Sequence, residues 1–268
     1  TPYTPYILKN LIPITIIAII LCVHKFDAQT LNHDVGLFIG STNLQSDYGN
    51  TKEFSSHFTN NGTSLSLSHY LSFNENTSRW GVRNRILDHL KLKTEIKYLS
   101  NGTFSHRGYY AEKKSIEGEK IRAMKGSLKM LDVGLNLECF LKPLSDRNDY
   151  SYNMYLNPFF TFGFKYSFYT NGVTSELGDW NKDRTLLPTW YSEENALDIG
   201  AGEALSVCSG IGIVGRISSN IDLVTQVSYQ YFFSDSIDGL NPNKVDGTNS
   251  NEYSVNIEFG IIYQLNFY

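Results

Sequence analysis

The strongest constraint in this 268-residue chain is an alternation of apolar and polar residues that recurs in eight segments. Side chains on a β-strand point to opposite faces in turn, so this period of two predicts strands with one apolar face. A soluble strand averages ~5–6 residues, whereas a strand that crosses a membrane in a barrel needs ~9–11. The alternating segments cover residues 33–42, 64–73, 90–100, 130–141, 154–170, 204–218, 221–233 and 253–268.

The connections between these segments alternate in length. Four are long and polar, at roughly residues 43–61, 100–127, 170–202 and 234–252. The three between them are shorter, at roughly 74–89, 142–153 and the tight turn at Asn220. Long loops at one end and shorter turns at the other are typical of outer-membrane barrels. The sequence therefore predicts an all-β fold, an eight-stranded antiparallel transmembrane up-and-down β-barrel over residues 29–268.

Charged residues of both signs fall on the polar face of the predicted strands. A soluble sandwich also alternates apolar and polar residues, but its polar face meets water and its loops need no such asymmetry. In a narrow closed barrel these charges would face the lumen and would have to pair across it. The residues concerned are Lys93, Glu95, Lys97, Asp132, Glu138, Lys165, Arg216, Asp222 and Glu258.

Composition agrees with a protein at a membrane surface. The chain has 18 Tyr and 16 Phe, and tyrosine favours the boundary between water and an apolar phase. Its formal charge of −4 contains no block of one sign, which gives no support to nucleic-acid binding. Outer-membrane lipid is the expected surrounding, with both chain termini in the periplasm.

The N-terminal segment is interpreted separately. Residues 11–23 form an uninterrupted apolar run after Lys9, too short for a transmembrane helix, which needs ~20 residues. The run suits the hydrophobic region of a signal peptide, with a cleavage point after Ala28, although Phe26 fits that site poorly. We therefore expect a signal peptide over residues 1–28, and an N-terminal membrane anchor is the alternative.

Few residues of the sequence suggest a catalytic or metal-binding site. The mature histidines are not spaced as metal ligands, and none is followed by a serine two places later as in outer-membrane lipid A deacylases. Cys139 and Cys208 fall on opposite strand faces, which predicts that they form no disulfide. We expect no enzymatic activity, metal or cofactor. The loop with Asp235, Asp238, Asn241 and Asn243 could offer oxygens to calcium, but its Asp-Gly and Asn-Pro pairs favour a turn.

The last segment, YSVNIEFGIIYQLNFY, resembles the polar-x-Gly-x-x-aromatic-x-hydrophobic signal by which barrel assembly machinery recognises a final strand. That resemblance implies a role in assembly for six residues and makes the machinery an expected partner. The six are Glu258, Gly260, Tyr263, Leu265, Phe267 and Tyr268.

Three stretches resemble the PorG-like outer-membrane β-barrel family, which is associated with the type IX secretion system. They are HDVGLFIGSTNLQSDYG, IRAMKGS and QYFFSDSIDGLNPN. The resemblance implies a small non-enzymatic barrel that contacts periplasmic ring proteins of the protein secretion and gliding motility apparatus. Two alternatives stay open: an adhesin-like barrel whose long loops contact other surfaces, and a lipid-modifying enzyme of the outer membrane.

Overall fold

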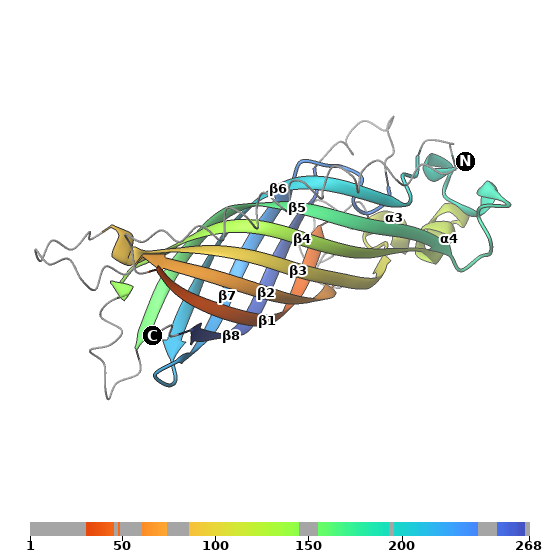
Figure 1. Ribbon diagram of the computed structural model, residues 1–268. Coiled ribbons are helices and arrows are strands. Elements are labelled where there is room, and N and C mark those ends of the chain that lie inside the picture. The colour runs from red at the N-terminus through yellow and green to blue at the C-terminus, as the bar shows by residue number, and fades with distance from the viewer. Residues whose placement is uncertain are drawn as a thin grey trace, which may run out of the picture.

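The computed structural model describes residues 31–45, 48, 61–73, 86–144, 155–192, 196–240 and 251–265. The predicted signal peptide, His57, Asn241, Asn243, Phe267 and Tyr268 lie outside these residues. Within them the chain forms one closed barrel of eight antiparallel strands (Figure 1). This confirms the predicted fold class.

Each strand pairs with its neighbours in sequence, and β1 pairs with β8, for example through Ile39 and Phe259. Closure leaves no open strand edge, which a sheet surrounded by lipid could not tolerate. The strands are β1 (Leu31–Gln45), β2 (Asn61–Phe73), β3 (Leu90–Ser105), β4 (Met124–Phe140), β5 (Leu156–Ser175), β6 (Ala201–Arg216), β7 (Ile221–Phe232) and β8 (Tyr253–Leu265).

The two ends of the barrel differ. The turn end carries the β2–β3, β4–β5 and β6–β7 connections, together with the start of β1 and the finish of β8. The loop end carries the other connections, including α3 (Tyr109–Glu112) and α4 (Ile116–Ala123), which lie at the right-hand end of the barrel in Figure 1. Short 3-10 turns occur at η1 (Leu87–His89), η3 (Arg184–Leu186) and η4 (Thr189–Tyr191). No helix in the described ranges is both long and apolar enough to cross a membrane.

Several strands extend further toward the loop end than the sequence predicted. β3 runs to Ser105 and β4 begins at Met124, inside the stretch 100–127 that was expected to be a loop. β5 likewise runs to Ser175, inside the expected loop 170–202. The predicted boundaries of these two loops were wrong. The strands continue there, but their inward face becomes apolar and their outward face becomes polar.

The change of polarity is sharpest on β4. Between Leu131 and Leu137 the outward-facing residues are apolar, and Leu135 is 51% exposed, while inward Asp132 and Glu138 are buried. From Met130 toward Met124 the same two faces exchange character: Met130 is only 2% exposed and Leu128 is buried inside. The outward positions there are Ser127 and Lys129, which are exposed to solvent.

β3 and β5 change at the same level. On β3, outward Ile96 and Tyr98 are followed by outward Ser100, while the inward face changes from Lys97 to Leu99. Two parts of one barrel follow from this exchange. We call the part with an apolar outer face the membrane belt, and the part beyond Leu131 toward the loop end the upper barrel.

Apolar clusters fill both ends of the barrel interior. The upper barrel holds a core that includes Phe104, Met124, Leu128, Tyr169 and Phe232 and that also buries loop residues such as Leu187 and Ile237. A smaller cluster at the turn end includes Phe38, Tyr70, Phe140, Phe159 and Ile262. The charged lumen of the membrane belt therefore lies between two apolar layers.

Candidate interaction sites at the two ends of the barrel

A network of ion pairs occupies the lumen of the membrane belt. Glu95 is its centre: the two carboxylate oxygens lie 3.1 Å from Lys93 Nζ and 2.6 Å from Lys165 Nζ. Lys97 Nζ lies 3.0 Å from Glu258 Oε1, and Gln226 Nε2 donates to Glu258 Oε2 at 2.6 Å. All these side chains are buried, so each charge depends on its partners.

The prediction that charges face the lumen is confirmed for all nine residues except Arg216. Arg216 is half-buried at the turn end and donates to the backbone oxygens of Ser218 and Ser219, 3.0 and 3.3 Å away. Two further lumen residues, Asp34 and Lys91, were not among the nine, and their charged atoms lie 2.6 Å apart. The alternation does place Lys91 on the polar face with Lys93, Glu95 and Lys97. Asp34 could have been found, because it shares the polar phase of HDVGLF.

Aromatic rings take up space between the charges. Gly260 leaves room for the Phe38 ring, because a Cβ at this position would lie inside that ring's van der Waals surface. Lys93 Nζ in turn lies 4.7 Å from the centre of the Phe38 ring. Rings, ion pairs and the two apolar layers fill the interior, as expected of an eight-stranded barrel with room for side chains but not for a channel.

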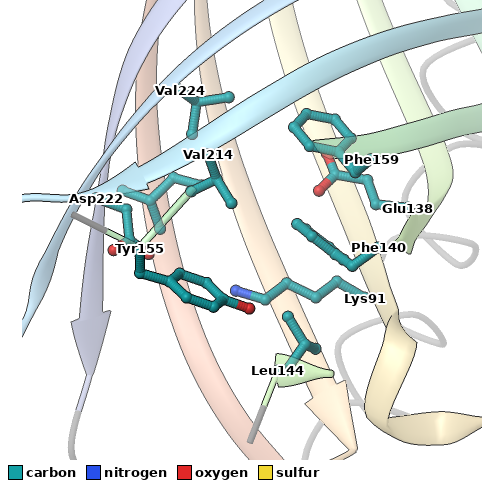
Figure 2. Close-up of a pocket in the computed structure, with 10 residues that line it drawn as sticks. Lys91, Glu138, Phe140, Leu144, Tyr155, Phe159, Val214, Asp222 and Val224 are labelled. Atoms are coloured by element: carbon teal, nitrogen blue, oxygen red, sulfur yellow. The ribbon is translucent and has the colours of Figure 1, made fainter. Parts of the chain in front are cut away.

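A small cavity lies at the turn end of the lumen (Figure 2). Lys91 and Tyr155 extend into it from opposite sides, beneath Phe140. Glu138 is 2% exposed, and its Oε1 has no hydrogen-bond partner among the described residues. The space is about that of one water molecule, which suits hydration of a carboxylate better than binding of a substrate.

The described histidines are not grouped as metal ligands. His33 Nδ1 and His69 Nε2 lie 3.0 Å apart on the outer face of β1 and β2, whereas His89 Nδ1 contacts Phe140 O at 2.8 Å. His106 directly follows β3, in the upper barrel beside Tyr48. Within the described ranges no three His, Cys, Asp or Glu side chains come together as metal ligands.

The two cysteines lie on opposite faces of the barrel wall, as predicted. Cys139 is exposed on the outside, Cys208 is buried inside, and both are free thiols. Cys208 Sγ donates to Asn136 Oδ1 at 2.9 Å, so the buried thiol joins the polar lumen.

The stretch with Asp238 is a turn. Asp238 Oδ1 accepts from Leu240 N at 2.8 Å, and Gly239 has a φ of +84°, which favours glycine. Glu252 ties this turn to β8 by accepting from Ile237 N and Asp238 N, at 3.1 and 3.0 Å. The turn interpretation is confirmed for these residues; Asn241 and Asn243 lie outside the described part.

The residues of the predicted assembly signal are divided between the two faces of β8. Glu258 and Gly260 point into the lumen, and Tyr263 is exposed on the outer face. Leu265 ends the strand, while Phe267 and Tyr268 lie outside the described residues. Recognition of this strand by barrel assembly machinery stays a prediction.

A cluster of exposed aromatic residues lies at the loop end. Tyr109 and Tyr110 on α3 are 64% and 63% exposed, and their ring centres lie 5.5 Å apart. Trp190 of η4 is 36% exposed, with its ring centre 6.4 Å from that of Tyr110. Lys113 Nζ lies 4.4 Å from the centre of the Tyr109 ring. We call Tyr109, Tyr110, Lys113 and Trp190 the aromatic tip.

Sequence reasoning missed the aromatic tip, because it treated residues 100–127 and 170–202 as loops without site residues. The Tyr-Tyr pair at 109–110 within a polar stretch was the available signal. Trp190 carried no comparable signal, since it is 80 residues further along the chain and meets the pair only in the folded protein.

Comparisons with known proteins concern the fold. No family model matches the chain, and no curated protein does. The chain is similar to the solved structure of Ail, the attachment invasion locus protein of Yersinia pestis, with 12% identity, 88% of this chain and 99% of that chain covered, and a TM-score of 0.41. It is also similar to Neisserial surface protein A, with 10% identity, coverage of 88% and 100%, and a TM-score of 0.44.

A third similar structure is a major outer membrane protein from Thermus thermophilus. The identity is 14%, the alignment covers 88% of this chain and 100% of that chain, and the TM-score is 0.46. The outer-membrane enzyme PagL is similar at 10% identity and a TM-score of 0.33. The PorG-like resemblance rests on the sequence motifs alone.

Proposed function

We propose that this chain is a non-enzymatic β-barrel of the cell outer membrane that works through the surfaces at its two ends. The observation that carries the proposal is the apolar outer face of a closed barrel whose lumen is filled with paired charges. Such an outer face suits hydrocarbon, and closed barrels are the β-architecture that can span it. A filled lumen leaves the exposed ends for contact with partners.

The proposed orientation places the turn end in the periplasm and the loop end outside the cell. Because the strand number is even, β1 begins and β8 finishes at the same end. The connections at that end are shorter on average, with β6–β7 formed by residues 217–220 alone, although β2–β3 (residues 74–89) is no shorter than β1–β2 (residues 46–60) at the other end. Outer-membrane barrels keep short turns in the periplasm and long loops outside. Both termini are then periplasmic.

The finer proposal is a structural role in a type IX secretion or gliding apparatus. Its support is the resemblance of the three sequence motifs to PorG-like barrels, and the partners it implies are periplasmic ring proteins. In the proposed orientation such partners would meet the turn end.

Affinity capture of the tagged barrel from membranes solubilised after cross-linking tests this role. We expect periplasmic ring proteins to be recovered, and not with an unrelated outer-membrane barrel of similar abundance tagged in the same way. Recovery of outer-surface ligands without any ring protein would contradict the secretion role.

An adhesin-like role is the second candidate, and the exposed aromatic tip favours it. A lipid-modifying enzyme is the third. Incubation of the purified barrel with labelled lipid A tests the enzyme class, and we expect no turnover. Release of a labelled fatty acid that depends on the folded barrel would overturn the non-enzymatic proposal.

A further inference from the structure

We propose that the aromatic tip of Tyr109, Tyr110, Lys113 and Trp190 is a binding surface for an acidic polysaccharide outside the cell. The inference rests on the proposed orientation and deepens the adhesin-like candidate by naming the chemistry of its partner. It depends on four features of the tip: its distance from the membrane belt, its support, its rings and its charge.

The tip stands clear of the membrane belt. Beyond Leu131 the outward residues of β4 are Lys129, Ser127 and the partly exposed Lys125, and Thr170 and Thr174 hold the matching outward positions on β5. At ~3.3 Å per residue, β4 travels roughly 20 Å along the strand between Leu131 and Met124. Tyrosine and tryptophan rings that anchor a protein at the membrane–water interface lie at the edge of the belt. The tip rings lie too far from that edge to serve as such anchors.

Packed structure supports the tip. Arg122 Nη1 on α4 donates to Ala111 O and Lys113 O, at 2.5 and 3.0 Å, and this holds α3 against α4. Glu117 Oε2 accepts from Thr189 N at 3.0 Å, which joins α4 to the segment that carries Trp190. The neighbouring Tyr191 is buried in the core of the upper barrel. The backbone segments that carry the rings are therefore anchored to the upper barrel before any partner binds.

The rings offer faces and edges in several directions. Tyr109 and Tyr110 meet at 75°, and Tyr110 and Trp190 at 68°, so the rings are not stacked face to face. An aromatic face is electron-rich and attracts the weakly positive C–H bonds on the apolar side of a sugar ring. The tyrosine hydroxyls add donors and acceptors for sugar hydroxyls.

The charge of the tip favours an anionic sugar. Lys113 Nζ lies 4.4 Å from the centre of the Tyr109 ring and 5.1 Å from that of Tyr110, so an ammonium group lies over one side of each ring. The exposed Lys114 and Arg107 add positive charge close by in the chain. Across residues 107–122 the five basic side chains outnumber the three acids, Glu112, Glu117 and Glu119, and Glu117 pairs with Lys120 at 3.3 Å. A carboxylate on the sugar would meet the ammonium groups while the sugar ring meets aromatic carbon.

The small size of the apolar surface favours a glycan over a protein. A stable protein interface buries ~800 Å² on each partner and involves ~20–30 residues on each side. Among the described residues of α3, η4 and the start of α4, the exposed large apolar side chains are Tyr109, Tyr110, Trp190 and Ile116. Three rings and one ammonium group offer a surface of the size that a few sugar units would cover.

Binding of alginate, a polyuronate, to the purified full-length barrel in nanodiscs tests the inference, with dextran as the neutral polysaccharide. We expect binding to alginate that weakens as salt is raised, and at least tenfold weaker binding to dextran. Lys113→Glu and the double variant Tyr110→Ala with Trp190→Ala should each weaken alginate binding at least tenfold. Lys129→Glu and Leu177→Ala, which change an exposed charge and an exposed apolar residue outside the tip, should bind within twofold of the wild type.

Folding of every variant is checked by its heat-dependent mobility on unboiled gels. A folded wild type that ignores alginate, or binds dextran equally well, would overturn the inference while leaving the barrel proposal intact. Tip variants that bind like the wild type would also overturn it, as would capture of a pure protein ligand by the tip in the absence of glycan. Failure of the wild type to insert into lipid would instead contradict the proposed function.

Discussion

Lys165 on β5 and Glu95 on β3 meet across the intervening strand β4, with Lys165 Nζ 2.6 Å from Glu95 Oε2. Lys93 reaches the other oxygen of the same carboxylate at 3.1 Å. The Lys165–Glu95 contact joins two strands that are not neighbours in the barrel wall, whereas Lys93 and Glu95 lie on the same strand. The lumen network therefore braces the cylinder as well as neutralising its charges. Removing one partner of such a pair leaves the other as a buried charge with less compensation.

Replacing Lys165 with methionine should therefore destabilise the barrel. Removal of one partner of a buried ion pair costs about 3–5 kcal/mol, mainly because the remaining charge loses its compensation. The free energy of unfolding in lipid vesicles, measured by urea titration, gives the effect. In a Glu95→Gln background, where this pair is already absent, Lys165→Met should cost less, and an equal cost in both backgrounds would contradict the pairing.

Gly260→Ala tests the packing of a ring into the lumen. A Cβ at position 260 would overlap the Phe38 ring, so we expect a loss of about 1–3 kcal/mol in the free energy of unfolding. Gly102→Ala is the matched control, because a Cβ there meets no atom within 4 Å. Its effect should stay within about 0.5 kcal/mol, as for most surface changes. Equal effects of the two changes would contradict this account.

Lysine substitutions on the outer face of β4 test the limit of the membrane belt. Leu135→Lys would place a charge in lipid, at a cost of about 2–4 kcal/mol near the middle of the bilayer. Ser127→Lys lies on the same face of the same strand in the upper barrel, where we expect about 0–1 kcal/mol. The free energy of unfolding in vesicles checks both values, and a large cost at Ser127 would place the membrane edge elsewhere.

We expect His106 to make the upper barrel less stable in acid. Burial beside Tyr48, whose ring centre is 4.4 Å away, and then the charge of Lys125 lower the pKa of His106 to about 3. In the unfolded chain the pKa is about 6.5, so below that pH the unfolded state takes up a proton that the folded state refuses. Stability from this group is complete above pH ~6.5 and declines as the pH falls toward ~3.

The measurement is hydrogen exchange of the upper-barrel amides between pH 7 and pH 4, with rates corrected for intrinsic exchange. We expect the protection of these amides to fall with pH in the wild type and to fall less in His106→Gln. The same pH dependence in both proteins would show that His106 has no part in it.

The sequence predicted the membrane belt well, because alternation and charge phase are local properties of each strand. Lys93, Glu95 and Lys97 on one face of a strand with Ile96 on the other leave little choice of orientation. The upper barrel escaped this reasoning, since Leu128 and Met130 lie inside while Lys129 lies outside, the reverse of the pattern further along β4. A prediction that expects every strand to be apolar outside and polar inside therefore assigns such a stretch to a loop.

The candidate sites were harder to predict than the strands. Specific ion pairs depend on which strands face one another across the lumen, and Lys165 and Glu95 are 70 positions apart. The aromatic tip likewise needs α3 and η4 to come together, and α4 joins them: Arg122 contacts α3, and Glu117 accepts from Thr189 of η4. Contacts between residues so far apart in the sequence are set by the tertiary structure, and the spacing of residues along the chain does not reveal them.

The most direct test of the central claim is the depth of successive outward residues of β4. In a variant with Cys22, Cys139 and Cys208 replaced by serine, single cysteines at positions 125, 127, 129, 131, 133, 135 and 137 would carry a spin label in vesicles. Accessibility to lipid-soluble oxygen and to a water-soluble nickel chelate gives the depth of each label. The account predicts chelate access at 125–129 and oxygen access at 131–137, with the reversal between Lys129 and Leu131. Chelate access along the whole row would contradict a barrel that spans the membrane.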